Sequence, residues 1–495
     1  MKNIYKIILI PVFFLVISCD NELLKPFTPG ALTEEVAITN ANDLRRITNN
    51  CYVALNNRSD IEFSSVFTDE VSIGLTNGGQ GISDNYAFFM IPSSTSPNGI
   101  WNTCSVVLAR ANKVIINADK LLLNPSLTAT AATEIKVLKG EALMLRAYSH
   151  LRMISYFSIN PRDDNALGGI LALREVGVDQ FLPREKNGLI YNSIHNDLND
   201  AINLIGSFAF DATRANKIAA IAIKARAYAL KGDYPNALVQ ANLVIATPGL
   251  VSLSTTSQYQ AIFWTDTNNE VIFKLSRNIN QSTQATNIGN IWASVDATYG
   301  GSPFYEINRS LFNSINPTDI RYQTVVAPSS LVDPNYLTST NYKQTDVLVV
   351  GKHPGTAAKR PLNNDFKLIR MSEMYFIKAE AEISAGQLIS AATTLKFLLD
   401  RRFPTPQTLP VFANATEGWK FILDQRRIEF AFEGYRFIDL KRLGGVNFAN
   451  TGIERDSRDC NGSNCSLPVS DYRFALPIPT AELNSNPTIQ QNPGY

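Results

Sequence analysis

Glu429 and Glu433 are the pair of residues in this 495-residue chain whose type and spacing come closest to a catalytic arrangement. Two carboxyl groups can hydrolyse a glycosidic bond, one as the acid and the other as base or nucleophile. These glutamates are one helical turn apart, however, and Arg426 and Arg436 flank them. Opposite charges three or four positions apart pair on a helix, so we predict an ion-pair network here and no catalytic site.

The histidines give no stronger case for catalysis or metal binding. Only His150, His195 and His353 are present, and none has Cys, Asp or Glu neighbours at metal-ligand spacing. The chain contains no H-E-x-x-H, G-x-S-x-G or phosphate-loop motif. The glycine-rich stretch at 78–81 follows no clear strand and reads as a loop. We therefore predict a protein that is not an enzyme and holds no metal and no cofactor.

Recognition of a sugar or a peptide is the chemistry that remains. Sugars present apolar C–H faces fringed by hydroxyls, so their sites combine aromatic rings with amides. The polar segment 278–305 offers that mixture, and an early loop adds a second group. The predicted ligand-binding residues, led by Trp292, are Trp292, Tyr299, Phe304, Tyr305, Asn287, Asn290, Tyr86 and Trp101. The alternative for each aromatic is that it pins a loop to the body, which is the role we predict for Trp264 and Trp419.

The first residues have the pattern of a secretory signal. Lys2 and Lys6 precede an apolar run at 7–17 that is too short to span a bilayer. Val16-Ile17-Ser18-Cys19 then resembles a lipobox, in which Cys19 becomes the lipidated first residue of the mature chain. The alternative is an ordinary signal peptide with an incidental cysteine. Because no later segment has a long apolar run, we predict that the lipid on Cys19 is the only membrane contact.

Four other cysteines remain. Cys460 and Cys465 lie in a polar loop, and we predict that they can form a disulfide in an oxidising compartment. Cys51 and Cys104 each lie in a helical pattern with apolar neighbours. For that second pair, two buried thiols and a bridge between helices are both open.

The charge balance excludes one class of partner. Lys and Arg number 45 and Asp and Glu number 44, so no global field attracts nucleic acid. The length behind Cys19 is enough for a large core, and we expect two intertwined lobes.

Helical periodicity fills most of the chain. Apolar residues recur at three and four positions over 131–156, which predicts one long helix. Two helix pairs are predicted at 216–245 and 369–402, with turns at Gly232 and Gly386 and small alanines at the crossings. Such pairs are tetratricopeptide-like. Because they are far apart in the chain, a simple solenoid with a period of about 34 residues is excluded.

Several of these stretches resemble the SusD/RagB family of outer-membrane nutrient-binding lipoproteins of Bacteroidetes. The matching stretches are 425–442, with Gln425-Arg-Arg-Ile-Glu429 and Asp439-Leu-Lys-Arg442; the ending 486–495; the helices at 100–115, 134–157 and 370–381; and the strand Asn269-Glu-Val-Ile-Phe273. The acidic residues after Cys19 also resemble a signal for display on the cell surface.

The resemblance implies a mostly α, SusD-like fold with tetratricopeptide-like helix pairs, irregular loops and a few short strands. It divides the chain into a signal peptide at 1–18, an N-terminal portion at 19–250 and a C-terminal portion at 251–495, with variable ligand-facing loops at about 274–367. It implies a surface-exposed, lipid-anchored protein of the outer membrane. That protein would capture oligosaccharides or peptides and deliver them, as a lid, to a TonB-dependent SusC-like transporter. A surface glycoside hydrolase and a helical-repeat scaffold without a small ligand are the alternatives.

Overall fold

The structure is a computed structural model of the whole chain. It describes residues 38–56, 58–75, 84–177, 179–207, 209–247, 251–281, 286–292, 303–356, 359–445, 451–460 and 462–495. The predicted lipidation site Cys19 and the predicted ligand contact Tyr299 lie outside these ranges.

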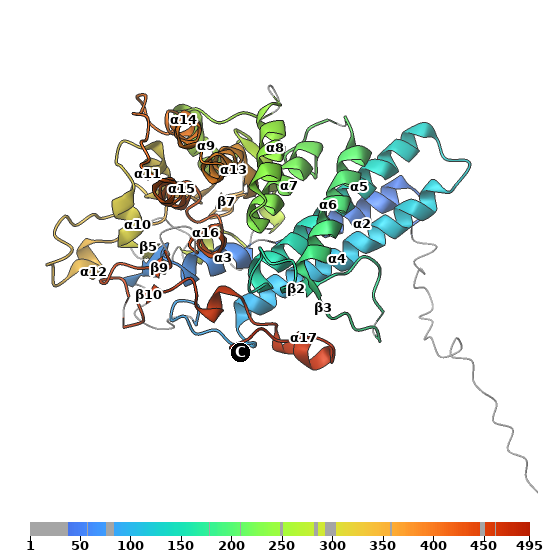
Figure 1. Cartoon of the computed structure of the whole chain (residues 1–495), viewed down its shortest axis with the longest axis horizontal. Coiled ribbons are helices and arrows are strands. Elements are labelled where there is room, and N and C mark those ends of the chain that lie inside the picture. Colours follow the sequence, from blue (N-terminus) through green and yellow to red (C-terminus); the bar gives the residue numbers. More distant parts are fainter. Residues whose placement is uncertain are drawn as a thin grey trace, which may run out of the picture.

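Helices dominate the described part of the chain, as predicted from its periodicity (Figure 1). In the first half they are α2 (Ala41–Ala54), α3 (Arg58–Phe67), α4 (Thr95–Leu122), α5 (Ala129–Phe157), α6 (Asn187–Ile205), α7 (Lys217–Lys231) and α8 (Tyr234–Ile245). In the second half they are α9 (Thr256–Trp264), α10 (Arg309–Ser314), α11 (Ile320–Val325), α12 (Tyr342–Thr345), α13 (Met371–Ser384), α14 (Leu388–Leu399), α15 (Ala415–Glu429), α16 (Arg436–Leu443) and α17 (Thr480–Ser485).

The strands are short and form separate two-stranded antiparallel ribbons. The pairs are β1 (Val71–Ile73) with β5 (Tyr305–Ile307), β2 (Leu167–Ile170) with β3 (Arg184–Lys186), β4 (Val271–Leu275) with β8 (Phe366–Arg370), β6 (Gly355–Thr356) with β7 (Arg360–Pro361), and β9 (Ile453–Glu454) with β10 (Ser466–Leu467). The strand expected at 269–273 is therefore confirmed as β4, which spans 271–275.

The long helix predicted at 131–156 is confirmed as α5. From Gly140 to Phe157 every residue of α5 is buried, because α4 covers one side of it and α6 another. A helix that is apolar or paired around its whole circumference belongs in the interior. The bundle of α2, α4, α5 and α6 makes one end of the molecule (Figure 1).

Both predicted helix pairs are confirmed. α7 ends at Gly232 (φ +83°), which takes the left-handed conformation open to glycine, and α8 follows two residues later. α13 and α14 are joined by a turn that contains Gly386 (φ +74°). α8 packs against α13, so the two pairs meet although about 140 residues separate them.

The two halves of the chain are intertwined. α3 lies beside α16 (Figure 1). β1 pairs with β5, with Ile73 opposite Tyr305. An early segment therefore completes the lobe that the C-terminal half builds. This contact brings β1 and the residues that directly follow it, Gly74 and Leu75, to the predicted ligand-facing region.

Cys51 and Cys104 are free, buried thiols, which decides between the two alternatives left by the sequence. Burial raises the pKa of Cys51 to about 12 and that of Cys104 to about 11, so both thiols stay protonated. No helix in the described ranges is long and apolar enough to cross a membrane.

Candidate functional site

The charged motif at 425–442 lies in the interior, and its pairing differs from the local pattern predicted. α15 ends at Glu429, and Phe432 (φ +61°) and Gly434 (φ +86°) turn the chain before α16 begins. Glu433 and Arg436 are therefore not on the helix that carries Glu429. The expectation that each charge pairs with the next turn was wrong for these residues, because the turn directs them to partners from distant segments.

Both carboxylates of the candidate catalytic pair are held by cations. Glu429 accepts hydrogen bonds from Arg402 (Nε to Oε2, 2.9 Å) and Arg370 (Nη1 to Oε1, 2.8 Å). These guanidinium groups, Arg402 foremost, hold the pKa of Glu429 well below its usual range against the effect of burial. Glu433 accepts from Lys352 (2.7 Å) and from Arg370. The acid in glycoside hydrolysis needs a raised pKa, whereas the pKa of Glu429 is lowered.

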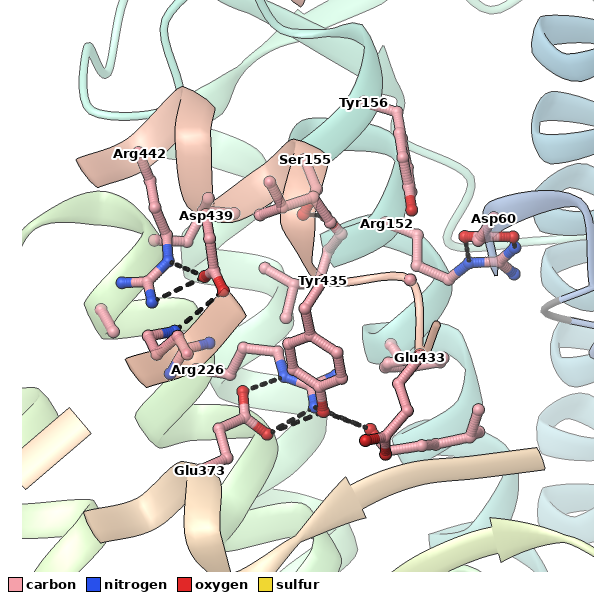
Figure 2. Close-up of a pocket in the computed structure, with 18 of the residues that line it drawn as sticks. Asp60, Arg152, Ser155, Tyr156, Arg226, Glu373, Glu433, Tyr435, Asp439 and Arg442 are labelled. Atoms are coloured by element: carbon pink, nitrogen blue, oxygen red, sulfur yellow. Dashed lines mark hydrogen bonds and ion pairs between the residues drawn. The ribbon is translucent and has the colours of Figure 1, made fainter. Parts of the chain in front are cut away.

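A small cavity borders this network (Figure 2). Its volume is about 80 Å³, below the roughly 300 Å³ at which ligand pockets begin. Its walls carry paired charges: Arg226 donates to both oxygens of Glu373 (2.7 and 2.6 Å) and to the hydroxyl of Tyr435 (2.7 Å). A cavity of this size and polarity fits a few ordered waters, so we assign it no ligand.

Trp292 is inside the protein. Its side chain is 2% exposed, stacks on His353 (ring centroids 5.4 Å) and meets Phe432 edge-on (5.3 Å). The expectation that Trp292 is an exposed ring on which a sugar could stack was wrong, because its ring packs against His353 and Phe432 in the core. Asn287 is buried and Asn290 is half-buried in the same short segment. Ligand contact by these residues stays a prediction.

Trp101 lies near the start of α4. It is buried against Phe157 (4.9 Å), and its Nε1 donates to Glu482 of α17 (3.0 Å). This contact ties the C-terminal segment to the helical bundle. The structure thus gives Trp101 a packing role.

The structure does bring Tyr86, Phe304 and Tyr305 together, at one end of the β1–β5 ribbon. Gly74 beside β1 donates its N–H to the carbonyl of Phe304 (2.9 Å), and both Phe304 and Tyr305 are partly exposed. Tyr86 is fully buried, and its hydroxyl donates to the carbonyl of Asp459. Tyr86 therefore has no exposed ring face to offer a ligand.

Two residues that the sequence reasoning did not single out complete this group. The hydroxyl of Tyr342 donates to the carbonyl of Arg458 (2.9 Å), and the Arg458 guanidinium lies 4.8 Å from the centre of the Tyr342 ring. Lys343 donates to the carbonyl of Ile73 on β1 (3.4 Å). Both side chains are partly exposed. Their only signal in the sequence was their place within the variable stretch 274–367.

Two carboxyls lie beneath these residues. Glu306 of β5 accepts from the N–H of Leu75 (3.3 Å), and Asp459 accepts from the N–H of Arg309 (2.6 Å). Burial raises the pKa of each to about 7. We call the set Phe304, Tyr305, Glu306, Tyr342, Lys343 and Asp459 the ribbon-end site. The cavity that Glu306, Tyr342, Lys343 and Asp459 help to line is about 10 Å³, room for about one water, so a ligand would lie on the outer face.

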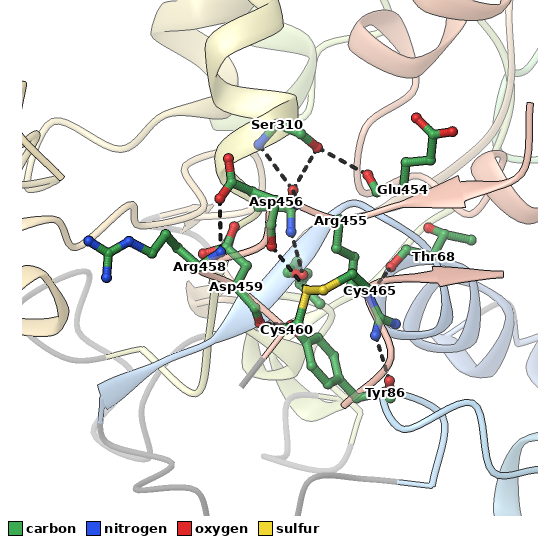
Figure 3. Close-up of a disulfide and its surroundings, with 12 residues drawn as sticks. Thr68, Tyr86, Ser310, Glu454, Arg455, Asp456, Arg458, Asp459, Cys460 and Cys465 are labelled. Carbon is green, nitrogen blue, oxygen red and sulfur yellow. Dashed lines mark hydrogen bonds between the residues drawn. A yellow bond between two sulfur atoms is a disulfide. The ribbon is translucent and has the colours of Figure 1, made fainter. Parts of the chain in front are cut away.

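The predicted disulfide is present and supports this site (Figure 3). Cys460 follows Asp459 directly, so the bond to Cys465 restrains the turn that carries the Asp459 carboxyl. Arg455 in the same loop donates to the carbonyls of Val66, Phe67, Thr68 and Tyr86. Val66 and Phe67 end α3 and Thr68 follows it, and a cation satisfies the unpaired acceptors of a helix end. The loop is thereby fastened to both α3 and Tyr86.

No group of three or more His, Cys, Asp or Glu in the described ranges could hold a metal ion. His150 accepts from the N–H of Ala172 (3.2 Å) through Nε2, and burial lowers its pKa to about 3. It is a neutral packing residue.

Two family models match the chain. The model of the SusD family matches residues 255–495, and one described as starch-binding and associating with the outer membrane matches residues 34–229. The chain is also similar to SusD-like protein P2 of Formosa agariphila, at 24% identity over 534 residues that cover 99% of each protein.

Solved structures share the fold. A SusD superfamily protein of Bacteroides thetaiotaomicron matches with a TM-score of 0.76 at 24% identity, over 92% of this chain and 100% of that one. A protein described as a laminarin-binding SusD-like protein matches with a TM-score of 0.66 at 19% identity, over 92% of this chain and 100% of that one.

Proposed function

The chain belongs to the SusD/RagB family, and from this premise we propose that it captures oligosaccharides at the outer face of the ribbon-end site and delivers them to a TonB-dependent SusC-like transporter. The membership itself rests on two family models that together span most of the chain and on similarity along its whole length.

The observation that carries the proposal is the composition of the ribbon-end site. Two partly exposed tyrosines, Tyr305 and Tyr342, offer ring faces for the C–H surfaces of a sugar. The ammonium of Lys343 can bind its hydroxyls, and the carboxyl of Glu306 lies buried beneath. Asp459, which lies beneath them, sits in a loop that a disulfide and Arg455 fasten to the helical body, and this favours a preformed site.

Binding without bond cleavage is the expected chemistry. Glu429 and Glu433 are occupied by guanidinium and ammonium groups, so they cannot approach a substrate. Glu306 and Asp459 have raised pKa values, but the space between them holds about one water and no sugar ring. A glycoside hydrolase of this chain would therefore need another carboxylate pair.

Glycans are the ligand class we favour over peptides, because relatives with this fold include a laminarin-binding protein and the matching family model is described as starch-binding. The test is a titration of the purified full chain in detergent with neutral glucans, among them laminarin and maltohexaose, and with a peptide panel. We expect saturable binding of at least one glycan without release of shorter products. Peptide binding alone, or turnover of the glycan, would overturn the proposal.

Anchoring at the cell surface and the lid role follow from the family and from the lipobox-like Val16-Ile17-Ser18-Cys19. Cys19→Ala should move the chain from the outer-membrane fraction to a soluble fraction in cells that lack the transporter. The unaltered chain should co-purify from native membranes with a β-barrel transporter. A Cys19→Ala chain that remains with membranes would refute the anchor.

A further inference from the structure

A second hollow lies on the surface between α9 and α11, with a lining that shares no residue with the cavity at the ribbon-end site. Its volume is about 420 Å³, which falls within the range of small-molecule sites. Two aromatic rings, Trp264 and Tyr322, and two amides, Gln260 and Gln323, contribute to its walls together with Val326, Pro328, Ser330 and Val332. We call it the α9–α11 groove.

The floor of this groove is held rigidly. The segment after α11 pairs with residues 347–350: Ala327 donates its N–H to Val349 (2.9 Å), and Leu331 and Val347 exchange two hydrogen bonds (2.9 and 2.8 Å). The hydroxyl of Ser330 also accepts from the N–H of Val349 (3.0 Å). A wall of paired backbone keeps its shape without a ligand, which lowers the entropy cost of binding.

The indole of Trp264 is fixed at one edge. Its Nε1 donates to the carbonyl of Gly351 (3.1 Å), while its neighbour Phe263 is fully buried. Trp264 itself is only partly buried, so part of the ring faces the groove. The hydrogen bond to Gly351 agrees with the predicted role of Trp264 in pinning a loop to the body, while part of its ring remains exposed. Tyr322 is backed in the same way by Phe312 (5.6 Å) and is partly exposed.

The polar groups of the groove are all neutral. None of the described residues that line it carries a charge, in contrast to the ribbon-end site. Gln260 uses its Nε2 to donate to the carbonyl of Gln323 (3.0 Å), which holds its amide in place and leaves Oε1 as an acceptor. Phosphates, carboxylates and charged peptides would find no counter-charge here. Aromatic faces edged by neutral amides and a hydroxyl suit an uncharged sugar.

We propose that the α9–α11 groove is a second saccharide-binding site, in which a neutral sugar ring lies on Trp264 and Tyr322 and its hydroxyls bond to Gln260 and Gln323. The choice of ligand rests on the proposed glycan-binding function. Two sites on one chain would increase the apparent affinity for a polysaccharide that reaches both, beyond what either site gives a short oligosaccharide.

The test is titration calorimetry of the full chain with maltohexaose and laminarin, using variants of each site. Trp264→Ala and Gln260→Ala should each remove the second binding event and weaken polysaccharide binding about tenfold. Trp264→Phe, which keeps an aromatic face, should retain most of the binding at this groove.

The matched control is Gln240→Ala, which removes a partly exposed amide on α8 and should change neither binding event. Melting curves separate lost binding from lost folding, and Gln260→Ala covers the case in which Trp264→Ala unfolds.

The outcomes distinguish this inference from the proposed function. Glycan binding that is unchanged in Trp264→Phe, Trp264→Ala and Gln260→Ala would overturn the second site and leave the ribbon-end site standing. Glycan binding that persists in Tyr342→Ala but is lost in Gln260→Ala would support the α9–α11 groove and would make it the main glycan site in place of the ribbon-end site. If no neutral glycan binds the unaltered chain, both proposals fail.

Discussion

Arg370 binds Glu433 through two hydrogen bonds, from Nε to Oε2 (2.8 Å) and from Nη2 to Oε1 (2.7 Å), with both side chains buried. Arg370 ends β8, and Glu433 lies in the corner between α15 and α16. The pair therefore connects the β4–β8 ribbon to the charged motif at 425–442. The fork geometry of arginine suits such a two-bond contact, and lysine would not replace it.

Glu433→Ala should destabilise the fold by about 3 kcal/mol, because it leaves the buried Arg370 and Lys352 without one of their carboxylates. Chemical denaturation measures this cost. Asp424→Ala on α15, which breaks an exposed pair with Lys420, is the control and should cost no more than about 0.5 kcal/mol. A stable Glu433→Ala chain that no longer binds glycan would place this residue in the ligand site.

Glu306→Gln should stabilise the protein above neutral pH. The pKa of Glu306 is raised by burial from 4.5 to about 7, so the unfolded chain releases this proton first as pH rises. Folding stability contributed by this group is therefore full below about pH 4.5 and is lost as pH rises through about 7. The neutral amide avoids that loss, and its advantage at pH 8 should be about 2–3 kcal/mol and vanish by pH 4.5.

The measurement for Glu306 is a difference in unfolding free energy between variant and unaltered chain across that pH range. The difference is needed because the buried His150 and His195, with pKa values lowered to about 3 and about 4, act in the opposite direction below pH 6.5. Glu62→Gln, at an exposed carboxylate, serves as control. An advantage for Glu306→Gln that does not depend on pH would show that this carboxyl is charged in the folded protein.

Replacing Cys460 and Cys465 with serine should cost about 2 kcal/mol of stability, the value for so short a loop. The larger effect should be on glycan affinity, because the loop carries Asp459 and Arg455 to the ribbon-end site. Reduction of the unaltered chain should reproduce both effects. Unchanged affinity in the double variant would show that the disulfide supports only its own turn.

Trp292→Ala should lower the unfolding free energy by about 3 kcal/mol, because it removes a buried ring that packs on His353 and Phe432. Trp292→Phe should cost less, since it keeps most of the aromatic contact. Chemical denaturation measures the unfolding free energy of each variant, and titration of the same samples measures its glycan affinity. Unaltered stability with lost glycan affinity would show that Trp292 contacts the ligand, as the sequence predicted.

The elements whose pattern is local were predictable. α5, the pairs α7–α8 and α13–α14, and β4 all follow from periodicity and from turn glycines such as Gly232, and the structure has them within two residues at most ends. The Cys460–Cys465 disulfide was predictable because five positions separate its members in a polar loop.

The partners of buried charges and the site itself depended on contacts between distant segments. Glu429 and Glu433 suggested a local network, but their partners Arg370, Arg402 and Lys352 come from elsewhere in the chain. Trp292 has the polar neighbours of a surface loop and is nevertheless buried, because His353 and Phe432 reach it from other elements. Tyr342 and Lys343 give no periodic signal, and only the fold brings them to β1 and β5.

The central claim is that a glycan binds at the outer face of the ribbon-end site, and titration of Tyr342→Ala with laminarin and maltohexaose tests it most directly. Loss of a stacked ring at a binding surface costs about 2 kcal/mol, so the affinity for the bound glycan should fall roughly 30-fold at an unchanged melting temperature. Gln344→Ala, an exposed neighbour on α12, should bind as the unaltered chain does. Equal affinity in Tyr342→Ala and the unaltered chain, with both folded, would contradict the account.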